Sequence, residues 1–194
     1  MKKSTTELSD PRHLLVKVAR VLAKLNIPYI VTGGMAVFIW GRPRFTADID
    51  ILIKLNAKDI DALAVALGAL HEMSYIDMHM MRNAFQWKGE FNFIDGESGI
   101  KVDFFIAEDT HFEQLQIKRH IRKPVLGYNV HVISPEDLIL SKLLWYKQGE
   151  SSKQLEDIES VIKIQKKIDW KYINKWAKIH TTAKTLASLR KKYV

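Results

Sequence analysis

The chain has 194 residues, of which 47% are hydrophobic and 27% charged; 30 Lys and Arg against 22 Asp and Glu give a formal net charge of +8. This composition is typical of one globular domain, or of one small domain with a helical appendage, and argues against a disordered chain. Cysteine is absent, which excludes disulfides, thiolate metal sites and cysteine nucleophiles and fits a reducing cytoplasm.

The first 13 residues carry two lysines but no apolar segment after them, so we expect no secretory signal. No later stretch approaches the roughly 20 apolar residues that a helix needs to cross a bilayer. We therefore expect a soluble, cytoplasmic protein without membrane contact.

The first part of the chain alternates between helix and strand patterns. Ser9, Asp10 and Pro11 predict a helix start, because a capping side chain is followed by a proline whose missing N–H is not needed in the first turn. Apolar residues at helical spacing continue this helix to Asn26. The elements predicted next are a strand over 29–32, a helix over 35–40, a strand over 47–54 and a helix over 56–70.

The rest of the chain predicts two pairs of strands and then only helices. The turn-forming residues 95–99 predict a hairpin of strands 84–94 and 100–107, and Leu126-Gly127 predicts another of strands 117–123 and 128–133. Helical spacing then marks residues 135–147, 152–166, 170–179 and 182–192. We expect an α+β fold with a mixed sheet flanked by helices, divided into a domain of residues 1–133 and a helical C-terminal region of residues 134–194.

Asp48 and Asp50 are separated by one residue within an apolar strand. Side chains alternate across a strand, so both carboxylates lie on one face and repel each other. A divalent cation relieves this repulsion, and carboxylate oxygens are ligands that suit Mg²⁺. Asp103 is a third acid within an apolar strand, and if the two strands are neighbours, three carboxylates converge that could hold two Mg²⁺ ions.

Thr32, Gly33 and Gly34 lie where a strand becomes a helix. Glycine lets the backbone approach a ligand closely, and a helix N-terminus offers N–H groups and a partial positive charge to phosphates. Thirteen residues separate Gly34 from Asp48, enough for one short helix and a return loop. The phosphate cradle and the metal ligands can therefore face one cleft.

This order of residues resembles the DNA polymerase β-like nucleotidyltransferase superfamily, whose signature is Gly-Gly or Gly-Ser, then an acid-hydrophobic-acid triplet, then a separate acid on a later strand. Two segments resemble the bacterial branch that contains the AbiEii-type toxins: the sequence around Gly33 and Asp48, and the segment from Ser134 to Asp157. The resemblance covers about residues 14–166. It implies a nucleotidyltransferase catalytic domain over residues 1–133.

The resemblance also implies roles for the single residues. Asp48 and Asp50 would chelate the metal ions, and Asp103 would bind one of them and help to deprotonate an acceptor hydroxyl. Gly33 and Gly34 would hold the triphosphate through backbone amides. Many relatives have serine at the position of Gly34, so here Thr32 or the backbone must contact the phosphates.

Two basic residues complete the implied nucleotide site. Arg44 lies shortly before the acid pair and could contact phosphate, and Lys142 could neutralise phosphate charge from the opposite wall. Arg42, two residues before Arg44, is a further candidate for a phosphate contact. The alternatives are that Arg44 is a surface charge or pairs with an aspartate, and that Lys142 is an exposed helix lysine. Asp157 could pair with Lys142 or face water. The seven histidines have no metal-ligand spacing, so we interpret them as structural or exposed.

The leading functional hypothesis is a Mg²⁺-dependent, cytoplasmic enzyme that transfers NMP from an NTP, such as ATP, to a hydroxyl of RNA, protein or a small molecule. The AbiEii branch implies a toxin–antitoxin or phage-defence role with a cognate toxin or antitoxin as partner. Residues 150–194 contain eleven basic and five acidic residues, a net charge near +6 that favours RNA, although a lysine-rich solvated surface is equally ordinary. The alternatives are a non-catalytic antitoxin or scaffold, and an RNA-binding protein with a vestigial cleft.

Overall fold

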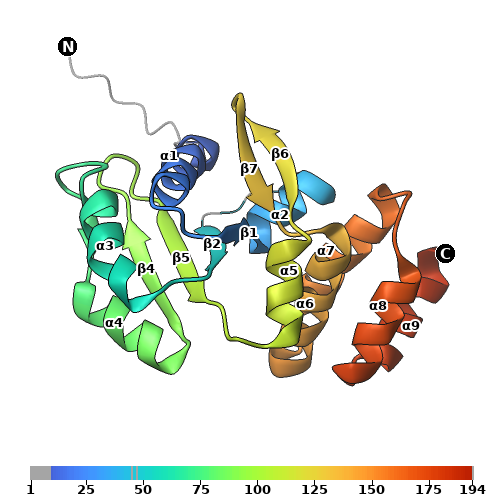
Figure 1. The fold of residues 1–194 in the computed structure, drawn as a ribbon. Helices are drawn as coiled ribbons and strands as arrows, with labels where there is room; N and C mark the ends of the chain where they lie inside the picture. Colours follow the sequence, from blue (N-terminus) through green and yellow to red (C-terminus); the bar gives the residue numbers. More distant parts are fainter. Residues whose placement is uncertain (1–9, 45, 47, 194) are drawn as a thin grey trace, which may run out of the picture.

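The computed structural model describes residues 10–44, 46 and 48–193 (Figure 1). Three predictions fall on residues outside the described ranges. They are the helix start at Ser9, the first residue of the predicted strand at Ala47, and the absence of a secretory signal in most of the first 13 residues. In the described part of the chain, no helix has the length and apolar character needed to cross a bilayer.

A seven-stranded mixed sheet forms the centre of the fold, with strand order β3-β4-β5-β2-β1-β7-β6. Two neighbouring pairs, β2 with β5 and β1 with β7, are parallel, and the other pairs are antiparallel. The strands are β1 (Tyr29–Val31), β2 (Asp48–Ile53), β3 (Tyr75–Ile76), β4 (Glu90–Ile94), β5 (Lys101–Ile106), β6 (Ile121–Val125) and β7 (Tyr128–Val132).

Helices surround this sheet, and four of them follow its last strand along the chain (Figure 1). The helices are α1 (Pro11–Lys24), α2 (Gly33–Trp40), the 3₁₀ turn η1 (Ala57–Asp59), α3 (Ile60–Gly68), α4 (Met78–Trp87), α5 (His111–Lys118), α6 (Pro135–Gly149), α7 (Ser152–Ile164), α8 (Trp170–Ile179) and α9 (Ala183–Tyr193). This architecture confirms the predicted α+β class.

One face of the central strands is wholly apolar. Ile49, Ile51 and Phe104 are fully buried there, and Phe91 stacks on Phe104 with the ring centroids 4.9 Å apart. Helices α1, α3 and α4 contact one another or the adjoining strands on this side. The burial of large apolar side chains supplies the main favourable free energy of folding. The opposite face carries the acids Asp50 and Asp103, with the apolar Leu52 and Phe105 two residues further along the same strands.

Two predicted strands begin too early, because helices α4 and α5 were missed. Residues 84–87, predicted as strand, belong to α4, which Asp77 caps by accepting hydrogen bonds from the amides of His79 and Met80. Residues 117 and 118 likewise belong to α5, capped by Thr110. Both helices are short and half exposed, so their apolar spacing is masked by the strand pattern that follows them.

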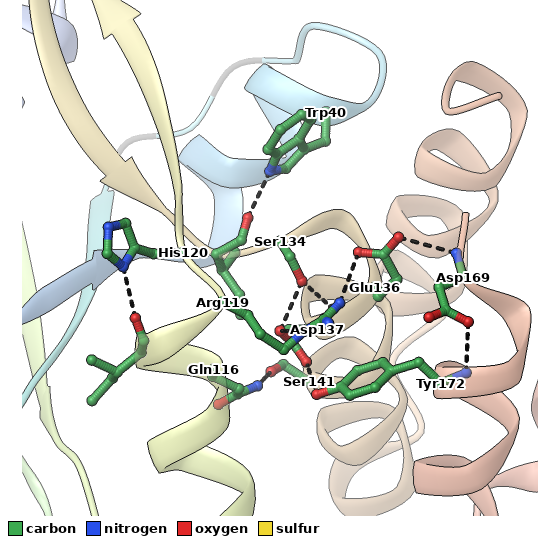
Figure 2. A network of polar contacts seen from close by, with 12 residues as sticks. Trp40, Gln116, Arg119, His120, Ser134, Glu136, Asp137, Ser141, Asp169 and Tyr172 are labelled. Carbon is green, nitrogen blue, oxygen red and sulfur yellow. Dashed lines mark hydrogen bonds and ion pairs between the residues drawn. The ribbon is translucent and has the colours of Figure 1, made fainter. Parts of the chain in front are cut away.

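A buried polar network joins α6 to α5 and α8 (Figure 2). Asp137 of α6 is fully buried and accepts hydrogen bonds from the hydroxyl of Ser134 (2.7 Å), the guanidinium of Arg119 (3.2 Å) and the hydroxyl of Tyr172 (2.7 Å). Burial raises the pKa of Asp137, and these donors act in the opposite direction. Because Arg119 follows α5 and Tyr172 belongs to α8, the network connects α8 to α5 and α6.

Replacing Tyr172 with phenylalanine is expected to lower the free energy of unfolding by about 1–3 kcal/mol, because one oxygen of the buried Asp137 loses its donor. Urea denaturation measures this change. The matched control is Tyr75→Phe, whose side chain is half exposed and whose variant should unfold as the parent does. An equal loss in both variants would contradict the role given to the network.

Candidate active site

The three predicted acids lie on adjacent strands. Strands β2 and β5 pair in parallel register, with Asp50 opposite Asp103 and Asp48 opposite Lys101. Residues that are opposite each other in a sheet point to the same face, so all three carboxylates share the face away from the apolar core. The condition on which the sequence argument depended, that the two acidic strands are neighbours, is met.

The Gly33-Gly34 turn lies directly against Asp50. The amide of Gly34 donates to Oδ2 of Asp50 over 3.2 Å, and the amide of Thr32 donates to the Asp50 carbonyl over 2.9 Å. Gly33 has φ +55°, and a Cβ built on it would overlap the Asp50 carboxylate, while a Cβ on Gly34 would overlap the hydroxyl of Thr46. Only glycine therefore lets the N-terminus of α2 come this close to the acids.

Asp50 lies in an environment that disfavours its charge. Burial, followed by the charges of Asp103 and Asp48, raises its pKa, although the hydrogen bond from Gly34 acts in the opposite direction. A carboxylate held in this way gains free energy from any cation that binds beside it.

Lys101 supplies such a cation from the chain itself. Its Nζ lies 2.7 Å from Oδ2 of Asp103 and 3.9 Å from Oδ2 of Asp48. The hydrogen bond to Asp103 raises the pKa of Lys101, which keeps the ammonium charged. Lys101 was not among the predicted site residues, although its position two residues before Asp103 places it on the same face of the sheet as the acids.

The carboxylates fit a divalent cation in their chemistry, since all are hard oxygen ligands on one face and Lys101 already provides positive charge there. Among the residues that the structure describes, no three Asp, Glu or His side chains are gathered closely enough to form a ready-made metal site. The ammonium of Lys101 occupies part of the space between Asp48 and Asp103, so it must move if a metal ion is to contact both.

Arg44 and Lys142, the two basic residues predicted to contact phosphate, meet at Asp157. The Arg44 guanidinium donates to both oxygens of Asp157 over 2.9 and 3.0 Å, and Nζ of Lys142 lies 2.8 Å from Asp157 Oδ2. Lys142 and Asp157 are both buried. Of the alternatives left open, the structure shows Asp157 paired with Lys142, and it shows Arg44 paired with an aspartate, which is the same Asp157.

This triad of Arg44, Lys142 and Asp157 borders the glycine turn. Nη2 of Arg44 lies 3.5 Å from the place that a Cβ on Gly34 would take. Burial lowers the pKa of Lys142, whereas the adjacent Asp157 and the charge of Asp50 favour its protonated form. Arg42, by contrast, has an exposed side chain, and its backbone amide donates to the hydroxyl of Ser160. The structure thus brings Arg44 and Lys142 to the site and leaves the Arg42 side chain at the surface.

Comparison with known proteins points to one family. The family model described as "Nucleotidyl transferase AbiEii toxin, Type IV TA system" matches residues 15–169, a range that contains every residue of the site. No curated protein matches the chain.

Several solved structures share the fold at low sequence identity. An antigenic nucleotidyltransferase-like protein from Paracoccidioides brasiliensis is 20% identical with a TM-score of 0.55, over 96% of this chain and 94% of that one. The antibiotic-resistance factor ANT(2'')-Ia is 15% identical with a TM-score of 0.56, over 93% and 95%. The lincosamide antibiotic adenylyltransferase LnuA is 13% identical with a TM-score of 0.52, over 81% and 99%. These matches confirm the nucleotidyltransferase fold.

Proposed function

The chain belongs to the AbiEii family of nucleotidyltransferases, and we propose that it transfers a nucleoside monophosphate from an NTP to a hydroxyl group with release of pyrophosphate. The observation that carries this proposal is the register of Asp50 with Asp103 directly beside the amides of the Gly33-Gly34 turn. That arrangement places anionic ligands for a cation next to a backbone site for phosphates.

Each group has a distinct task in this proposal. The backbone at Gly33 and Gly34, with Thr32, holds the triphosphate, and Arg44 and Lys142 offset its charge. Asp103 accepts the proton of the acceptor hydroxyl while the hydroxyl oxygen bonds to the α-phosphorus. The bond from that phosphorus to the bridging oxygen breaks, and its electron pair leaves with pyrophosphate.

Asp48, Asp50 and Asp103 would hold Mg²⁺, and two ions are proposed because three carboxylates can serve both. Bound Mg²⁺ would polarise the phosphate and lower the pKa of the attacking hydroxyl. The raised pKa of Asp50 supports this assignment, because burial, and to a smaller extent the charges of Asp103 and Asp48, disfavour its ionised form, which a bound cation would stabilise.

Replacing Lys101 with methionine is expected to increase the affinity for Mn²⁺ by about tenfold, because a competing charge leaves the carboxylates. Titration calorimetry with Mn²⁺ measures this directly, and Lys58→Met, which removes an exposed lysine from η1, is the matched control. Weaker binding in the Lys101 variant would show that the ammonium assists the metal rather than competing with it.

RNA is the acceptor that the charge favours, with a protein side chain or a small molecule as the other acceptors to be tested. The support is the net charge of +8 and the basic excess of the C-terminal helices. We further propose that residues 1–133 form the catalytic domain, with residues 134–194 as a helical region. The proposed setting is a cytoplasmic toxin–antitoxin or phage-defence system, which the family description supports.

The proposal is tested by incubating the protein with each labelled NTP, Mg²⁺ and total RNA, cell lysate or an aminoglycoside. Transfer of label to one acceptor class is expected, and EDTA should abolish it. A protein that binds RNA with a steep salt dependence but transfers no label would instead be the RNA-binding alternative.

A further inference from the structure

A cavity of about 190 Å³ lies on the face of the sheet that carries Asp50 and Asp103, next to these carboxylates in the direction of strands β2 and β5. Its floor contains Leu52 and Phe105, which follow Asp50 and Asp103 by two residues each. Since side chains alternate along a strand, floor and carboxylates share one face, about 7 Å apart along the strand direction. Thr32, the residue before the glycine turn, lines the same cavity.

Helices α5 and α6 form the opposite wall. Phe112 and Trp145 give this wall aromatic surface, and Lys142 Nζ lies 4.9 Å from the centroid of the Trp145 ring. The cavity therefore adjoins both the glycine turn and the triad of Arg44, Lys142 and Asp157. Aromatic surface beside a phosphate site suits a nucleobase, because every base has a flat face that can pack on it.

The polar residues that line this cavity are Thr32, Glu113, Gln116, Ser141 and Gln148, and one of them has an unsatisfied oxygen. Oε2 of Glu113 is buried and, among the described residues, has no hydrogen-bond partner. Nearby, Gln116 donates to the hydroxyl of Ser141 over 2.9 Å. A buried acceptor without a donor costs free energy, which a ligand that brings an N–H group recovers. Burial also raises the pKa of Glu113 to about 7, although hydrogen bonds from the backbone of Glu108 and the side chain of Thr110 act in the opposite direction.

We propose that this cavity holds the base of the incoming nucleotide, and that Glu113 selects bases with an exocyclic amino group over uracil. An ionised carboxylate only accepts hydrogen bonds, and adenine, cytosine and guanine each offer it an amino group. Uracil instead presents a carbonyl on each side of its one N–H, so its oxygens would face the carboxylate. The inference rests on the proposed function, because the base reaches the cavity only when the triphosphate is held at the neighbouring turn.

The test measures binding of non-hydrolysable analogues of the four NTPs, and of inorganic tripolyphosphate, by calorimetry with Mg²⁺ at pH 8.5, where Glu113 is ionised. The parent protein is expected to bind the adenine, cytosine and guanine analogues at least about tenfold more tightly than the uracil analogue. In Glu113→Gln this preference should disappear, because an amide can also donate to a carbonyl, while the affinity for tripolyphosphate stays unchanged. Glu72→Gln, which alters an exposed glutamate, should keep the preference.

Trp145 provides a second readout that does not depend on the folding of the Glu113 variant. Analogues that carry a base should quench the tryptophan fluorescence of the parent protein. The part of this quenching that comes from Trp145 should be absent in Trp145→Phe, and tripolyphosphate should not quench the fluorescence of either protein. Tight binding of all four analogues without preference, or quenching that is independent of Trp145, would overturn the inference and leave the proposed function standing. Failure of the parent protein to bind any analogue or tripolyphosphate would overturn both.

Discussion

Asp50→Asn is expected to lower nucleotidyl transfer by about a thousandfold. Asp50 is the acid opposite Asp103 and is held by the amide of Gly34, so its charge acts at the centre of the proposed site. Asparagine has nearly the same shape and can still accept that hydrogen bond. The substitution thus removes the charge and preserves the local structure.

The fold should tolerate this change well. Because burial raises the pKa of Asp50, its ionised form is disfavoured in the folded protein, and the neutral amide should leave the thermal unfolding temperature equal or higher. Transfer of labelled NMP and thermal unfolding are measured on the same preparation. Asp109→Asn, which changes an exposed acid, serves as the control and should retain activity. Undiminished transfer by the Asp50 variant would refute the assignment of the site.

Asp157→Asn is expected to have the largest effect on stability, a loss of about 3–5 kcal/mol in the free energy of unfolding. Asp157 is the shared anion of Arg44 and the buried Lys142. Without its charge, Lys142 remains buried beside a neutral group and close to the Arg44 cation. Urea denaturation monitored by circular dichroism gives the change in unfolding free energy.

A double variant separates the structural contribution of this ion pair from a contribution to nucleotide binding. Lys142→Met with Asp157→Leu replaces the pair by apolar side chains and should recover most of the lost stability. If Lys142 neutralises phosphate charge, as proposed, the stable double variant still binds NTP weakly. A double variant that regains both stability and NTP affinity would show that the pair only supports the fold.

The sequence was sufficient for the parts of the site that depend on local periodicity. Alternation along β2 placed Asp48 and Asp50 on one face, and Gly33 and Gly34 were expected where they are found, at the turn from strand β1 into helix α2. The same rule would have found Lys101, had it been applied to the residue two before Asp103. Periodicity failed at α4 and α5, where short helices run directly into strands.

Contacts between segments that are distant in sequence could not be predicted from local sequence patterns. Arg44 and Asp157 are 113 residues apart in sequence, and the packing of α6 and α7 against α2 brings them together. Glu113 belongs to a helix that was not predicted at all, so the cavity it lines could not be foreseen. The common face of the acids was therefore predictable from the sequence, whereas their surroundings required the fold.

The close approach of Thr46 to Gly34 ties two separate positions of the chain to each other. The Thr46 hydroxyl, which donates to the Asp48 carbonyl over 3.1 Å, fills the space that a side chain at position 34 would need. A side chain at position 34 therefore needs the Thr46 side chain to move or to be smaller. Replacing Gly34 alone should also disturb the hydrogen bond from Thr46 to the Asp48 carbonyl, whereas a simultaneous Thr46→Gly change should relieve the overlap.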